Sequence, residues 1–280
     1  MALDQLEDIE ESGKEMSFLD HLEELRWHLI RSVVAIVVFS IAAFLAKDLV
    51  WNTLILGPTK SDFLTYRFLC DIAERFNKPV LCFGDIPIDL IVTEITAQFT
   101  MHIKSSFIFG LILGFPYAFW EIWRFIKPGL HSNERKASRG VVFVVTMLFF
   151  LGVLFGYLVV TPISLNFLSN YQLDIAIQNQ IKINSIIGLV SALTLACGLM
   201  FQLPMLAYIL AKAGIVTPQL MRRFRKHAIV VILVLGAIIT PPDITSQILI
   251  ALPLTLLYEI SILVAKRVVK RKAKQEKEAL

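Results

Sequence analysis

The sequence predicts an all-α membrane protein that crosses the bilayer six times, with both termini on the cytoplasmic side. Three observations predict this class. The 280 residues are 56% hydrophobic and only 18% charged, which is too apolar for a soluble domain of this length. The apolar residues gather into runs, most of about 20 residues, the length that crosses a hydrocarbon core of about 30 Å. Lys and Arg crowd into alternate loops, as they do on the cytoplasmic side of membrane proteins.

Six apolar runs are the candidate spans. They cover about residues 28–47, 105–124, 139–162, 185–211, 227–240 and 246–265. The fifth run is short, because about 14 residues at about 1.5 Å each give roughly 21 Å, and we interpret it as a span beside which the bilayer thins. Residues 16–266 therefore form one membrane domain. It shows no internal repeat of the kind found in many secondary transporters.

The two ends of the chain are polar. Residues 1–15 carry many acids and no apolar period, which predicts a disordered leader, and residues 267–280 form a basic cytoplasmic tail. Ser17 opens an amphipathic helix that runs into the first span. Because the leading segment is long and acidic, we interpret the first run as a retained helix rather than a cleaved signal.

Loop charges give the orientation. Cations gather between spans two and three, between spans four and five, and after span six, whereas residues 163–184 hold only Lys182 and residues 241–245 hold none. Both termini are therefore expected in the cytoplasm. The first external loop, about residues 49–100, is long and amphipathic. We expect its short helices to form a cap on the external side.

Three cysteines fall into two environments. Cys70 and Cys82 lie in the first external loop, where both a disulfide and two free thiols are open alternatives; such a disulfide is worth about 3 kcal/mol. Cys197 lies within span four and is expected to be a small packing residue. No Cys/His metal spacing and no pair of nucleophile and base appears in the sequence. These patterns argue against a metal site, a cofactor and an enzyme.

Two carboxylates stand out at the cytoplasmic face, Glu24 before span one and Glu134 in the basic loop after span two. Each has a structural explanation. Glu24 belongs to an acidic face at a helix start, and Glu134 falls in the first turn of a helix that Ser132 can cap. The functional alternative is binding of guanidinium groups, which pair bidentately with carboxylates. Two such acids would select a ligand with paired arginines.

Three motifs resemble those of the TatC family, the signal-peptide receptors of the twin-arginine protein translocase. They are His21-Leu22-x-Glu24-Leu25-Arg26, Trp123-x-Phe125-Ile126-x-Pro128-x-Leu130-x-x-x-Glu134-Arg135 and Thr240-Pro241-Pro242-Asp243-x-x-Ser246-Gln247. The resemblance implies that Glu24 and Glu134 contact the two arginines of a signal peptide. It implies further that Phe125, Arg26 and Arg135 are their supporting neighbours. Pro58, after span one, also matches a family position.

The resemblance also implies location and partners. A protein of this family would lie in the bacterial cytoplasmic (inner) membrane and export folded cargo under the proton-motive force, with no nucleotide site of its own. Its partners would be twin-arginine signal peptides, single-span subunits of the TatA/TatB type, other copies of itself and membrane lipid, and no nucleic acid. At the external turn, Pro241 and Pro242 end span five and Asp243 can cap span six, near Gln247.

Polar residues inside the spans offer a second function. Gln202 stands where many relatives of this family carry Glu, and a neutral amide cannot titrate. It can bond a partner helix or a signal peptide, or else backbone loosened by Pro204. Glu259 is interpreted as the only acid deep in an apolar run, with Lys266 as its structural partner. A secondary transporter for a small solute, the alternative function, would use Gln202 and Glu259.

Overall fold

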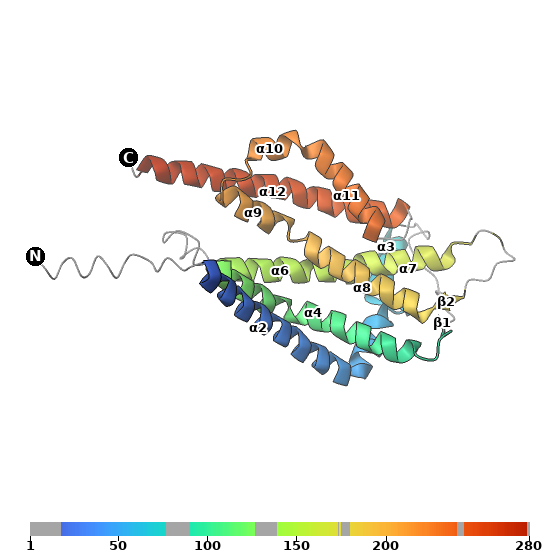
Figure 1. Ribbon diagram of the computed structural model, residues 1–280. Coiled ribbons are helices and arrows are strands. Elements are labelled where there is room, and N and C mark those ends of the chain that lie inside the picture. Colours follow the sequence, from blue (N-terminus) through green and yellow to red (C-terminus); the bar gives the residue numbers. More distant parts are fainter. Residues whose placement is uncertain are drawn as a thin grey trace, which may run out of the picture.

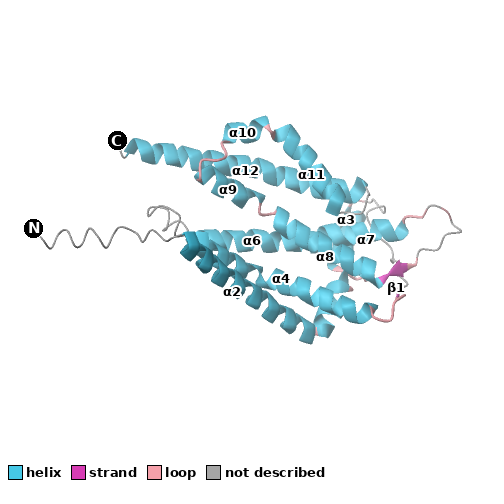
Figure 2. Ribbon diagram, in the orientation of Figure 1, coloured by secondary structure: helices cyan, strands magenta, loops and turns pink. Residues whose placement is uncertain are grey.

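The computed structural model describes residues 18–76, 90–126, 139–172, 174, 180–239 and 244–278. Its long helices run roughly along one direction and form an elongated bundle (Figure 1). Figure 2 shows helix in most of the described chain, with a single short strand pair in which β1 and β2 run parallel. The all-α class predicted from the apolar runs is therefore confirmed.

The described elements follow one another without a second domain intervening. In chain order they are α2 (Phe18–Leu45), the π-helical η1 (Leu49–Ile55), the 3-10 turn η2 (Gly57–Thr59), α3 (Leu64–Arg75), β1 (Leu90–Ile91), α4 (Ala97–Ile126), α6 (Arg139–Phe155), the π-helical η5 (Gly156–Val160), α7 (Thr161–Asn170), β2 (Ile181–Lys182), α8 (Ile183–Met200), α9 (Leu203–Lys212), α10 (Pro218–Arg223), α11 (Arg225–Ile239) and α12 (Ile244–Glu278). At one end of the bundle α2 begins, α4 ends, α6 begins and α12 ends (Figure 1). We call this end the terminal face.

Within the described residues, five helical segments are long and apolar enough to cross a membrane. They are Glu23–Leu45, Ala97–Ile126, Gly140–Asn170, Ile183–Lys212 and Gln247–Lys272. These segments correspond to predicted spans one to four and six. Helix α11 forms where the fifth span was expected, but its 15 residues rise only about 22 Å. The count of six spans therefore stays a prediction.

Two spans depart from a plain α-helix. The third continues through η5 into α7 and ends at Asn170, beyond the predicted end at residue 162. Pro162 does not stop it, because it lies in the first turn of α7, where a missing N–H costs nothing. The fourth span is interrupted at Phe201 and Gln202, just ahead of Pro204, which cannot donate to the preceding turn.

Glycines let two pairs of helices approach closely. On α4, a Cβ at Gly110 would lie 2.6 Å from the backbone nitrogen of Ser40 on α2, and one at Gly114 would lie 3.2 Å from the Cα of Ile36. On α6, a Cβ at Gly152 would lie 2.5 Å from the backbone oxygen of Cys197 on α8. Such small-xxx-small contacts let backbones pack where lipid supplies no hydrophobic drive between helices. A side chain at Gly110 or Gly152 would therefore collide with the facing backbone, while one at Gly114 would require its neighbours to shift slightly.

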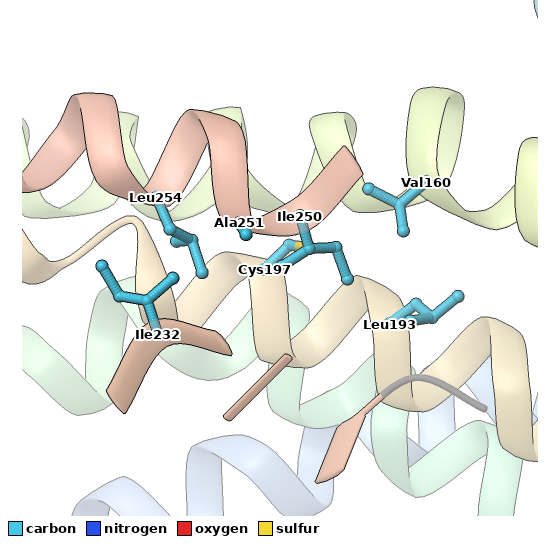
Figure 3. Close-up of a cluster of buried hydrophobic side chains, with 7 residues drawn as sticks. All are labelled: Val160, Leu193, Cys197, Ile232, Ile250, Ala251 and Leu254. Atoms are coloured by element: carbon cyan, nitrogen blue, oxygen red, sulfur yellow. The ribbon is translucent and has the colours of Figure 1, made fainter. Parts of the chain in front are cut away.

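One apolar cluster ties α11 and α12 to the rest of the bundle. Its buried side chains come from η5, α8, α11 and α12 (Figure 3). They are Val160, Leu193, Cys197, Ile232, Ile250, Ala251 and Leu254. Cys197 is free and buried within it, which confirms its expected packing role.

The segment after α2 packs over the end of the bundle opposite the terminal face. Tyr66 of α3 is buried, and its hydroxyl lies 2.9 Å from the Pro58 carbonyl oxygen and 3.0 Å from that of Pro162. Burial raises the pKa of this phenol. Thr65 donates a hydrogen bond to the Leu158 carbonyl. A helix in this loop was predicted, and Pro58 lies buried beneath it.

The last helix is longer than expected. Residues after 266 were predicted as a separate basic tail, but α12 continues to Glu278. Its last 25 residues contain neither Gly nor Pro and are rich in Lys, Glu, Ala and Arg, all good helix formers. Helix propensity therefore carries α12 beyond its apolar part.

Several predicted features lie outside the described residues. They are the acidic leader 1–15, Cys82, the loop residues Pro128, Glu134 and Arg135, and the turn residues Pro241, Pro242 and Asp243. Cys70 takes part in a disulfide. Since the chain has three cysteines and Cys197 is free, Cys82 is the expected partner.

Replacing Gly110 with Ala is predicted to destabilise the protein by about 1–3 kcal/mol, because the new methyl group meets the α2 backbone. Gly188→Ala on α8 is the matched control, since a Cβ there meets nothing within 4 Å. Its free energy of unfolding should stay within about 0.5 kcal/mol of wild type. Denaturant unfolding in detergent micelles measures both, and equal losses in the two variants would contradict the close packing.

The disulfide is testable by counting thiols. A mass tag that alkylates cysteines should add once to denatured, unreduced protein, at Cys197, and at all three cysteines after reduction. Cys82→Ser should release Cys70, so that two tags add without reduction. Three tags on unreduced wild-type protein would exclude the bond.

Candidate functional site

A pocket of about 390 Å³ opens between the beginning of α2 and the end of α4, near the terminal face. Its lining combines a carboxylate, an imidazole, an indole and two guanidinium groups. The lining residues are Glu24, Trp27, His28, Arg31 and Arg124. Residues 24, 28 and 31 lie on one side of a helix, since they are three and four positions apart. The pocket is thus a charged recess at the end of an apolar bundle.

A buried polar cluster lies beside this pocket. Glu121 of α4 is 1% exposed and His28 of α2 is 6% exposed. The Nδ1 atom of His28 lies 2.5 Å from Oε2 of Glu121, and the Tyr117 hydroxyl donates to Oε1 over 3.0 Å. Since a carboxylate only accepts hydrogen bonds, we assign the proton of this contact to Nδ1. Both carboxylate oxygens are thereby satisfied, as a buried acid requires.

His28 also contacts two residues that the motifs singled out. Its Nε2 atom lies 3.9 Å from Oε1 of Glu24, one helical turn earlier. Its ring meets that of Phe125 edge-on, with centroids 6.2 Å apart and planes at 60°. His28 therefore joins Glu24 on α2 to Phe125 and Glu121 on α4.

The structure brings only part of the predicted site together. Glu24 and Phe125 meet through His28, whereas Arg26 is exposed and does not line the pocket. Two residues along a helix amount to about 200° of rotation, which turns Arg26 away from Glu24. Glu134 and Arg135 lie outside the described residues. Within those residues, no three His, Cys, Asp or Glu side chains stand as candidate metal ligands.

Sequence analysis missed Glu121 and His28. It took Glu259 to be the only acid deep in an apolar run, and this was wrong, because Glu121 lies within the predicted second span and is almost fully buried. The aromatic residues around Glu121 suggest a belt at the membrane interface, and for this reason Glu121 was not singled out. The sequence held two clues. One was an acid within a span, which requires a partner, and the other was a histidine one turn after Glu24.

The comparisons with known proteins agree with the motifs. The family model described as Sec-independent protein translocase protein (TatC) matches residues 20–253. A protein of that description from Blattabacterium sp. subsp. Periplaneta americana (strain BPLAN) is 37% identical over 260 residues, covering 92% of this chain and 98% of the relative. The chain belongs to the TatC family.

Further relatives extend this result to structure. The TatC protein of Aquifex aeolicus (strain VF5) is 34% identical over 264 residues, covering 94% of this chain and 100% of the relative. A crystal structure described as the twin arginine translocase receptor TatC matches with a TM-score of 0.65 at 34% identity, covering 89% of this chain and 99% of that one. As a TatC protein, the chain is a multi-pass membrane component of twin-arginine protein transport.

Three further polar residues that the sequence singled out, Gln202, Gln247 and Glu259, bond to neighbouring helices. Glu259 forms a bidentate pair with Arg225 of α11, at 2.7 Å and 2.8 Å, so Arg225 takes the place expected for Lys266. Gln202 donates to the Val145 carbonyl of α6 over 3.1 Å.

Gln247 donates likewise to the Leu233 carbonyl of α11, over 3.1 Å. The two residues proposed for a solute site, Gln202 and Glu259, are thus engaged with different helices. The secondary-transporter alternative therefore finds no support in the structure or in the family.

Replacing Glu121 with Leu is predicted to destabilise the protein by about 3 kcal/mol, because it leaves His28 buried without its acceptor. Glu259→Leu is the matched control, since the side chains of Arg225 and Glu259 are each a little under half exposed, far more than those of His28 and Glu121. That change should cost less than about 1 kcal/mol. Unfolding in detergent micelles compares the two, and an equal cost would show that burial of the Glu121 cluster contributes little.

Proposed function

We propose that this TatC protein is the receptor subunit that binds the paired-arginine signal peptide of folded cargo at the terminal face. The observation that supports this most directly is the placement of Glu24, a partly exposed carboxylate that lines a charged pocket beside His28, whose ring packs against Phe125. Glu24 and Phe125 belong to motifs shared with the family. The crystal structure of the relative is described as that of a receptor, which agrees with this role.

The chemistry of the pocket suits a guanidinium ligand. Glu24 offers a carboxylate that a guanidinium can bind through two parallel hydrogen bonds. Trp27, which is 56% exposed beside it, offers an indole face for stacking with a cation. Such charge-assisted hydrogen bonds contribute about 1.5–3 kcal/mol each.

The pocket also contains cations that oppose a cationic ligand. Arg31 and Arg124 line it, and the Arg124 guanidinium lies 5.8 Å from the ring centroid of Trp120. A single acid does not overcome this repulsion easily. We therefore propose that Glu134 supplies the second acid, because the loop that carries it leaves α4 at Ile126, directly beside the pocket.

Membership of the TatC family supports a proposal for the wider assembly. We propose that the chain lies in the bacterial inner membrane with both termini in the cytoplasm, and that it recruits single-span subunits and further copies of itself. The export of folded cargo would then draw on the proton-motive force. Gln202 carries a neutral amide that already bonds the α6 backbone, so we assign it no role in moving protons.

A photo-crosslinking signal peptide with Arg-Arg tests the receptor role directly. Wild-type protein in membrane vesicles should crosslink to this peptide and much less to its Lys-Lys version, because ammonium groups cannot form the bidentate pair. Glu24→Gln and Glu134→Gln should each lower the yield about tenfold, for about 1.4 kcal/mol. The double variant should lose the preference for arginine.

Glu23→Gln provides the matched control. Glu23 is an exposed acid next in sequence to Glu24 and does not line the pocket, so its crosslinking should equal that of wild type. Unchanged crosslinking in the Glu24→Gln, Glu134→Gln double variant would overturn the proposal. An equal loss in the Glu23 variant would reduce the effect to net surface charge.

A further inference from the structure

We propose that His28 is a positioning residue for signal-peptide recognition: anchored by Glu121, it holds Glu24 in place to receive a guanidinium. This inference rests on the proposed function, because it assigns a task to Glu24. It concerns a residue outside the three family motifs. The contacts of the His28 ring, its burial and the charges of the pocket carry it.

The first step is that the imidazole is fixed. His28 is 6% exposed and Glu121 is 1% exposed, and the two come from different helices. Their contact of 2.5 Å places the proton on Nδ1. The anchor itself is held by the Tyr117 hydroxyl. With Nδ1 committed to Glu121, the ring directs Nε2 toward Glu24.

The second step is that Glu24 needs holding. Its side chain is partly exposed, and a free glutamate samples many rotamers whose loss opposes binding. Arg31 and Arg124 line the same pocket and would compete as resident guanidinium groups. Glu24 lies instead with Oε1 at 3.9 Å from Nε2 of His28. This distance is too long for a hydrogen bond, so the attraction is between charges: the imidazolium form of His28, with protons on both nitrogens, keeps the carboxylate at the rim, where a ligand can reach it.

The third step is that His28 couples the two helices of the site. Its ring packs edge-on against Phe125 of α4 while Nε2 faces Glu24 of α2. A shift of this ring would displace both residues together. His28 therefore acts through Glu24 and Phe125, and it need not touch the peptide.

Two amide substitutions separate anchoring from positioning. His28→Asn places its amide nitrogen near Nδ1, so it keeps the bond to Glu121 but loses the reach to Glu24. His28→Gln places its amide nitrogen near Nε2 and does the opposite. We expect His28→Asn to unfold near the wild-type temperature yet bind an Arg-Arg signal peptide about tenfold more weakly. His28→Gln should unfold earlier and bind closer to wild type.

The measurement uses the full-length protein in lipid nanodiscs. Fluorescence anisotropy gives the dissociation constant of a labelled Arg-Arg signal peptide, with the Lys-Lys peptide as the control ligand, and thermal unfolding is recorded for each variant. A double-mutant cycle with Glu24→Gln supplies the decisive comparison. If His28 acts through Glu24, then His28→Asn should cost no further affinity once Glu24 is already Gln.

The outcomes separate this inference from the proposed function. Wild-type protein that binds both peptides equally would refute the receptor role itself. The positioning role alone fails under three results together. Wild type prefers Arg-Arg, Glu24→Gln loses that preference, and His28→Asn still binds the peptide within about twofold of wild type. The positioning role fails as well if the His28→Asn loss persists in the Glu24→Gln background, or if loss of affinity follows loss of stability in both amide variants.

Discussion

The close packing of α2 against α4 is the constraint on which the charged pocket depends. Between Gly110 and Gly114 the contact on α2 moves back four residues, from Ser40 to Ile36. Seven residues further along α4, Glu121 meets His28, eight residues further back on α2. The two helices thus keep one antiparallel register from the glycine contacts to the terminal face. Because backbone contact fixes that register, the polar cluster forms where the helices emerge.

The buried acid in turn makes this register specific. Taking a carboxylate out of water costs several kcal/mol, and its partners recover that cost only with good geometry. A slip of one residue between α2 and α4 would leave Glu121 facing an apolar side chain. The pair of Glu121 with His28 forms in the same alignment in which Gly110 meets Ser40 and Gly114 meets Ile36. Packing and polar pairing therefore select the same arrangement.

The sequence predicted the helices well, since apolar runs and helix propensity are local properties, and it found Glu24, Phe125 and Pro58 through motifs. What it could not predict depends on contacts between helices. In the sequence, Glu121 is one acid among aromatic residues, and its partner His28 becomes apparent only when α2 packs against α4. Glu259 pairs with Arg225 rather than with Lys266 because α11 packs along α12. The third span was expected to end at residue 162, but Pro162 lies in the first turn of α7, where a proline does not end a helix. The hydrophobic pattern of one apolar run does not show how two helices align or which side chains pair between them.

In the proposed receptor site, two resident arginines oppose any cationic ligand that approaches Glu24. A cation entering the pocket meets Arg31 and Arg124 as well as Glu24, so charge alone gives little net attraction. A guanidinium can form two parallel hydrogen bonds to one carboxylate, while an ammonium cannot form this bidentate pair; either cation can contact the face of Trp27. Repulsion by the two arginines acts on both ligands alike, so it weakens the binding of both and leaves the difference between their binding free energies unchanged. In the proposed site, arginine is therefore preferred through its bidentate geometry at Glu24, and the resident arginines keep the affinity for other cations low.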